Sequence, residues 1–188
     1  MKESPAEGDV LLSSLNVRKL TYAALFLALA MVLPFITGQI PEIGKSLSPM
    51  HIPVLLCGFL CGWPWGLAVG AVAPLLRSVV FGMPAMFPGA VAMAFELATY
   101  GCLSGLLYRL LKKTKVNIYV TLIVSMIAGR IVWGIVRLIL AGLSGTTFTW
   151  ALFISGAVTT AIPGIILHIV LIPVLVMLLE KAGLSLNK

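Results

Sequence analysis

Long apolar runs constrain this chain more than any other feature, and one of them extends from Trp150 to Leu179 without an acidic residue, a lysine or an arginine. An uncharged apolar run of this length is typical of a helix that crosses a lipid bilayer. The bilayer interior offers the backbone no hydrogen-bond partner, so only helices and closed barrels cross it. Outer-membrane barrels use shorter, alternating strands. Only 10% of the residues are charged, against about 25% in a soluble domain, which supports the same class.

We therefore predict an all-α integral membrane protein, a bundle of six transmembrane helices with a short or broken second and third helix. The apolar stretch of residues 50–81 is interrupted by the sequence GWPWG, in which Pro64 should end a helix. The sixth helix contains Pro163 and Pro173, and we expect it to continue through both because neighbouring helices can satisfy the freed backbone groups. The predicted spans are residues 20–38, two segments within 50–81, and 89–111, 117–141 and 150–181.

Six spans place both termini on one side of the membrane, and the basic residues concentrate there. Lys45 is the only cation in the loops of the opposite side. The positive-inside rule makes the basic side the cytoplasm. We thus predict a cytoplasmic N-terminal tail over residues 1–17, disordered or interfacial, a membrane domain over 18–181 and a cytoplasmic C-terminal tail over 182–188. The net charge of +7 reports topology, so the expected partner is the lipid bilayer and no nucleic acid.

Small residues recur at helical spacing in the first three predicted helices. Glycines occupy every fourth position from Gly58 through Gly62 to Gly70, and Ala24 and Ala28 form a similar pair. Small residues at this spacing let membrane helices approach closely. Two interpretations stay open, which are packing within the bundle and a docking face for another membrane protein.

Arg130 and Arg137 lie one heptad apart within the predicted fifth helix. A charged side chain near the bilayer centre costs about 2.5–3.5 kcal/mol on insertion scales, so each needs a partner, water or an anionic ligand. Glu96 and Tyr100, four residues apart on the fourth helix, are predicted to share a face. Topology places all four in the outer half of the bundle.

Further polar and aromatic residues are predicted to converge on the same region, namely Trp133, Arg77 and His51, with His168 deeper. One interpretation is a structural salt bridge between Glu96 and one of the arginines, with structural histidines and Arg77 extended to the membrane interface. The other is an outward-open pocket for a solute with an anionic group, because arginine binds carboxylate or phosphate with paired hydrogen bonds. Tyr100 and Trp133 would then cover an apolar or ring-shaped part of that solute.

Catalytic motifs are not found in this sequence. It has no Gly-x-Ser-x-Gly, His-Glu-x-x-His or Walker motif, so the chain itself should not use ATP. Ser104 or Ser155 with His168 stays open as a hydrolytic pair, without specific support. We expect no cofactor and no metal site, and the cysteines are predicted to be buried packing residues: Cys57, Cys61 and Cys102.

Several motifs together resemble a known family. The pair Ala24-x-x-x-Ala28 resembles the docking motif of the substrate-binding S components of energy-coupling factor (ECF) vitamin transporters. The stretch MHIPVLLCG at residues 50–58, followed by GWPWG at 62–66, resembles a sequence stretch of the same family. The length and the six spans with short second and third helices are similar as well, and the resemblance covers about residues 18–180.

The resemblance implies a subunit of the bacterial plasma membrane that binds a micronutrient from outside with high affinity. It implies separate partner chains, a transmembrane coupling subunit and two cytoplasmic ATPases. Helices one to three, with Ala24, Ala28, Gly58 and Gly62, would face the coupling subunit, and helices four to six would line the pocket. The arginines favour an acidic vitamin such as pantothenate, with uncharged riboflavin next. A self-contained secondary carrier and a non-transport membrane scaffold with a structural Glu–Arg pair are the alternatives.

Overall fold

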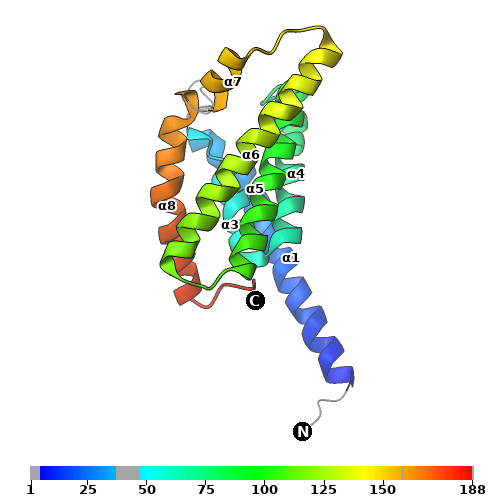
Figure 1. Ribbon diagram of the computed structural model, residues 1–188. Coiled ribbons are helices and arrows are strands. Elements are labelled where there is room, and N and C mark those ends of the chain that lie inside the picture. Colours follow the sequence, from blue (N-terminus) through cyan, green and yellow to red (C-terminus); the bar gives the residue numbers. More distant parts are fainter. Residues whose placement is uncertain (1–4, 37–46, 158, 188) are drawn as a thin grey trace.

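The computed structural model describes residues 5–36, 47–157 and 159–187, and these residues form a bundle of helices that contains no strand (Figure 1). Five helical stretches are long and apolar enough to cross a membrane, and α3 is a shorter apolar helix. The predicted all-α, multi-pass class is therefore confirmed. The helices are α1 (Pro5–Ile36), α3 (His51–Cys61), α4 (Trp63–Phe81), η1 (Met86–Ala90), α5 (Val91–Leu110), α6 (Lys115–Ser144), α7 (Trp150–Ala157), η2 (Thr159–Ala161) and α8 (Ile162–Lys181).

The first helix is longer than predicted. α1 begins at Pro5 rather than near Leu20, so the described part of the predicted N-terminal tail is helical. Proline suits the first turn of a helix, where an amide hydrogen has no partner within the helix. In Figure 1 the N-terminal part of α1 projects beyond the rest of the bundle. The cytoplasmic placement of this part stays a prediction.

The predicted break within residues 50–81 is present, two residues before Pro64. α3 ends at Cys61, and Gly62 adopts φ 98°, a conformation that favours glycine. Pro64 lies in the first turn of α4, where proline is tolerated. The turn thus consists of a single glycine, and α4 reaches 19 residues, enough to span the apolar part of a bilayer.

α3 forms the centre of the bundle. All 11 of its residues are buried, and it packs against α1, α4, α5 and α8. Close packing with its neighbours depends on glycines: a Cβ atom at Gly58 would meet Ser104, and a Cβ atom at Gly66 would meet the backbone of Gly101. Internal packing, one of the two interpretations of the glycine series, is therefore confirmed at Gly58 and Gly66.

The last span is interrupted, contrary to the prediction of one continuous helix over residues 150–181. The chain forms α7, a short 3-10 turn (η2) and then α8. Pro163 explains the interruption, because a proline donates no amide hydrogen and its ring crowds the carbonyl of the residue four positions earlier. The Thr160 hydroxyl donates instead to the carbonyl oxygen of Ser155 at 2.9 Å. Pro173 lies inside α8, which continues through it as predicted.

The C-terminal segment packs against the bundle. The backbone N–H of Leu186 donates to Leu60 O at 2.7 Å, and Asn187 Nδ2 donates to Gly105 O at 3.0 Å. Lys113, in the loop between α5 and α6, donates to Asn187 O at 2.8 Å. Both described ends of the chain lie at this end of the bundle (Figure 1). Which side of the membrane this end faces stays a prediction.

Candidate functional site

Glu96 is the centre of a buried polar cluster. It lies on α5, within an apolar sequence, and is only 1% exposed. Tyr100, one turn later on the same helix, donates from its hydroxyl to Glu96 Oε1 at 3.0 Å. The prediction that these two side chains share a face is confirmed.

The positive partner of Glu96 comes from α6. Arg130 Nη1 lies 3.0 Å from Glu96 Oε1. Gly129 permits this approach, because a Cβ atom there would overlap the ring of Tyr100. The expected salt bridge is therefore formed, and Arg130 is the arginine that forms it.

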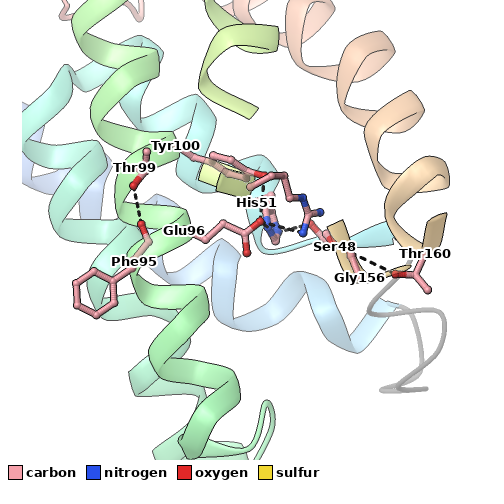
Figure 2. Close-up of polar contacts among 9 residues, drawn as sticks. Ser48, His51, Phe95, Glu96, Thr99, Tyr100, Gly156 and Thr160 are labelled. Carbon is pink, nitrogen blue, oxygen red and sulfur yellow. Dashed lines mark hydrogen bonds and ion pairs between the residues drawn. The ribbon is translucent and has the colours of Figure 1, made fainter. Parts of the chain in front are cut away.

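His51, the first residue of α3, completes the cluster around Glu96. Its Nε2 atom lies 3.5 Å from Glu96 Oε1, and its Nδ1 atom hydrogen-bonds to Ser48 O at 3.1 Å. Figure 2 shows His51, Glu96 and Tyr100 directed toward one another from α3 and α5. A buried ion pair is tolerated when further polar contacts offset the loss of hydration. Tyr100 supplies a hydrogen bond to Glu96, and the His51 ring lies close to the same oxygen.

His168 also belongs to this cluster, although the sequence placed it deeper. Its ring stacks on that of His51 with 5.8 Å between centroids and an interplanar angle of 25°. Only 2% of His168 is exposed. Its Nε2 atom is buried and has no hydrogen-bond partner in the part of the chain that the structure describes. The signal in the sequence was a single histidine within an otherwise uncharged run.

Arg137 lies apart from Glu96, in an aromatic environment. Its guanidinium carbon is 5.8 Å from the ring centroid of Trp133 and 5.6 Å from that of Phe148. Trp133 and Phe148 meet edge to face, and the ring of Phe153 of α7 also contacts Trp133. The prediction that Trp133 accompanies the arginines is met for Arg137, while Phe148 and Phe153 are neighbours that sequence reasoning missed.

Arg77 does not join the cluster. It is 3% exposed, and its Nη1 atom donates to Met31 O on α1 at 2.6 Å. The rings of Phe35 and Phe81 flank its guanidinium group at 5.1 and 5.2 Å. Arg77 therefore connects α4 to α1, and its burial excludes the interpretation that it extends to the membrane interface. These contacts give no support to the predicted role in solute binding.

A cavity of about 300 Å³ lies among α6, α7 and α8. Arg130 is the charged residue of its wall, which is otherwise apolar. Aliphatic side chains from α6 and α8 and one aromatic side chain from α7 form much of the remaining wall: Met126, Phe153, Ile165 and Ile169. The space can accept an apolar part of a small molecule beside the Glu96–Arg130 pair.

The four residues predicted to dock a partner fall into two groups. Ala24 and Ala28 are exposed on α1, whereas Ala23 and Ala30 face the bundle. Gly58 and Gly62 are buried, and a Cβ atom at Gly62 would lie 3.3 Å from Asn187 Oδ1. Only the alanine pair is accessible on the surface of the described chain.

Ser104, one of the remaining candidates for chemistry, makes structural contacts. The Ser104 hydroxyl donates to Leu55 O at 3.4 Å and to Gly101 O at 3.3 Å, so it serves the contact between α3 and α5 rather than His168. The three cysteines are free thiols. Among the described residues, no group of three or more acidic, histidine or cysteine side chains is arranged to hold a metal ion.

Comparison with known families decides the class of the protein. The model of the family ECF transporter, substrate-specific component, matches residues 18–176, most of the chain. The chain belongs to this family. The resemblance drawn from the sequence motifs is thereby confirmed. No curated protein and no solved structure matches the chain.

Membership of the ECF family makes this chain a membrane-embedded, substrate-binding transporter subunit and not an enzyme. It also implies a small-molecule substrate, and association with a membrane coupling component and with ATPases. The structure adds which polar residues meet within the bundle. Glu96, Tyr100, Arg130, His51 and His168 form one cluster, and Arg137 with Trp133 forms a second.

Proposed function

We propose that this ECF-family subunit binds an acidic or zwitterionic water-soluble vitamin with high affinity from outside the bacterial cell, and that an ATP-driven module completes uptake. Pantothenate is the favoured solute and riboflavin the next. The observation that carries the proposal is the difference between the two arginines. Arg130 is paired with Glu96, whereas no acidic side chain in the described part of the chain pairs with Arg137.

An unpaired arginine on a membrane helix supports an anionic ligand. The Nε atom of Arg137 is buried and lacks a hydrogen-bond partner among the described residues. Contacts with aromatic rings offset part of the cost of this half-buried cation, but they offer no hydrogen-bond acceptor in the plane of the guanidinium group. A carboxylate would supply two acceptors in that plane and neutralise the charge.

Substitution of Arg137 tests the acidic-group assignment. We expect Arg137→Ala to weaken pantothenate binding by about tenfold to a hundredfold, since a hydrogen bond to a charged group contributes roughly 1.5–3 kcal/mol. The affinity of Arg137→Lys should lie between those of the wild type and Arg137→Ala, because lysine keeps the charge without the paired hydrogen bonds. Equilibrium binding of radiolabelled pantothenate to the purified chain measures both.

The matched control is Arg109→Ala, which removes an exposed arginine from the last turn of α5. It should leave binding unchanged. Unaltered affinity in Arg137→Ala would contradict the assignment. If the wild-type chain binds riboflavin and not pantothenate, as followed by quenching of flavin fluorescence, the acidic-vitamin form of the proposal is wrong and the transport role stands.

The Glu96–Arg130 ion pair favours a second candidate function, a membrane scaffold in which the polar cluster is purely structural. Reconstitution separates the two. The transport proposal predicts that proteoliposomes accumulate pantothenate only when the coupling component, the ATPases and ATP accompany this chain. A scaffold would leave accumulation independent of the chain, and a self-contained carrier would need no ATPase.

A further inference from the structure

Three buried nitrogen atoms of the cluster around Glu96 lack a hydrogen-bond partner among the described residues. One, His51 Nε2, lies 3.5 Å from Glu96 Oε1, and the other two are His168 Nε2 and Arg130 Nε. Both have no hydrogen bond within the described ranges, although the other ends of the two side chains are engaged. Arg130 uses Nη1 for Glu96, and the ring of His168 stacks on that of His51. Burial without a hydrogen bond is unfavourable for both atoms, so a hydrogen-bond partner is expected for each.

The two atoms belong to helices that border the same space. Arg130 of α6 lines the 300 Å³ cavity, and so do Ile165 and Ile169 of α8, which flank His168 in the sequence. Both side chains also belong to the cluster around Glu96. Arg130 Nη1 lies 3.0 Å from Glu96 Oε1, and the His168 ring stacks on that of His51, whose Nε2 lies 3.5 Å from the same oxygen. A group that enters from the cavity between α6 and α8 meets Arg130 in its wall, and His168 belongs to the same polar cluster as Arg130.

The hydrogen-bonding requirements of the two atoms define that group. Arg130 Nε–H can only donate, so its partner must be an acceptor. His168 Nε2 donates or accepts according to the tautomer of the ring. A hydroxyl group, or an amide-type group with an N–H beside a carbonyl, satisfies both atoms at once. A carboxylate is less suited, since Glu96 already supplies a negative charge to Arg130 and would repel a second one.

We propose that His168 and Arg130 recognise a neutral hydroxyl or amide-type group of the solute, at the end remote from its acidic group. This inference rests on the proposed function, in which Arg137 holds the acid. Seven residues of α-helix advance about 10.5 Å, so the two ends of the solute are separated by roughly that length. His168 is then a specificity-determining residue, and the substrate class is a hydroxy- or ureido-type carboxylic acid with an apolar middle.

Two pairs of compounds test the inference on the unmodified chain. The first is pantothenate with N-(3,3-dimethylbutanoyl)-β-alanine, which keeps the acid and the central amide and lacks the two remote hydroxyls. The second is biotin with lipoate, which share a pentanoate chain and differ in the remote ring, ureido or dithiolane. We expect the polar member of at least one pair to bind at least tenfold more tightly than its partner.

Substitutions then assign the preference to His168. His168→Phe keeps a ring against His51 and removes the ring nitrogens. The affinity for the polar member of the pair should therefore fall tenfold or more, while the affinity for the apolar member should not change. His168→Gln restores a hydrogen-bonding group and should recover part of the preference. Ile166→Phe, on an exposed position of α8, adds a ring to the same helix and should change neither affinity.

The outcomes separate the two proposals. A preference that persists in His168→Phe, or equal binding of polar and apolar members by the wild-type chain, overturns the inference. If Arg137→Ala nevertheless weakens binding of the acids, the proposed function stands without this inference. If no acid of either pair binds the wild-type chain, the acidic-vitamin proposal fails and the inference fails with it. Since the wild-type comparison needs no substitution, a variant that does not fold leaves the test intact.

Discussion

At the scale of single residues, the two arginines of α6 have different environments despite their regular spacing. Arg130 contacts a carboxylate, and Arg137 contacts aromatic rings. The sequence predicts that both are exceptional, because charge within an apolar helix is costly. It does not predict which one meets Glu96, since that depends on the distance between α5 and α6, which Gly129 and Tyr100 set.

The Glu96–Arg130 pair gives a prediction for stability. We expect Glu96→Leu to lower the stability of the bundle by about 3 kcal/mol, because it leaves a largely buried guanidinium group without its counter-charge. The double variant Glu96→Leu/Arg130→Met removes both charges and should recover most of the loss. Thermal unfolding of the purified chain in detergent compares the three proteins. Equal midpoints for the single variant and the wild type would show that the pair contributes nothing to folding.

At the scale of helices, glycine determines how closely α4 and α5 pack. A Cβ atom at Gly101 would meet the backbone of Gly66, and one at Gly105 would meet the backbone of Trp63. Backbone atoms cannot move aside as a flexible side chain can, so these contacts require that the two positions stay without a side chain.

We therefore expect Gly101→Ala to destabilise the protein by about 1–3 kcal/mol, as overpacking of a close contact does. Gly142→Ala is the matched control, because a Cβ atom at Gly142 meets no other atom within 4 Å. Thermal unfolding midpoints of the two variants should separate, with the control at or above the wild type. A Gly101→Ala protein as stable as the control would show that α4 and α5 can separate at little cost.

The same helices show how far the sequence predicts the structure. Apolar runs predict where α4, α5 and α6 lie, because a bilayer leaves the backbone no alternative to helix. The breaks are less predictable. Pro64 is compatible with the first turn of a helix, so the break falls at Gly62. In the last span, the helix is interrupted before Pro163 but continues through Pro173. What differs between them is the tertiary context, which local sequence does not contain.

At the scale of the whole molecule, the predicted docking alanines lie on α1, and the polar clusters lie elsewhere. Ala24 and Ala28 are exposed on α1, together with the larger apolar residues Leu25 and Val32. The clusters around Glu96 and Arg137 belong mainly to α5, α6 and α8. This separation is consistent with docking and solute binding as independent functions.

Substitutions on α1 test that independence. Ala24→Leu together with Ala28→Leu should abolish co-purification with the transmembrane coupling subunit, since larger side chains prevent close helix approach. Pantothenate affinity should not change. Ala151→Leu, an exposed alanine of α7, is the control. A complex that survives the double substitution would exclude the alanine pair as the docking site.

The complete burial of α3 has a consequence for how the protein reaches the membrane during synthesis. Its 11 residues extend only about 16.5 Å, roughly half of the hydrocarbon thickness of a bilayer. A segment of this length cannot insert as an independent span, and none of its side chains faces lipid. Joined to α4 through Gly62 alone, it must enter the bilayer as one arm of a hairpin with α4. His51 can reach Glu96 only after that hairpin has assembled with α5.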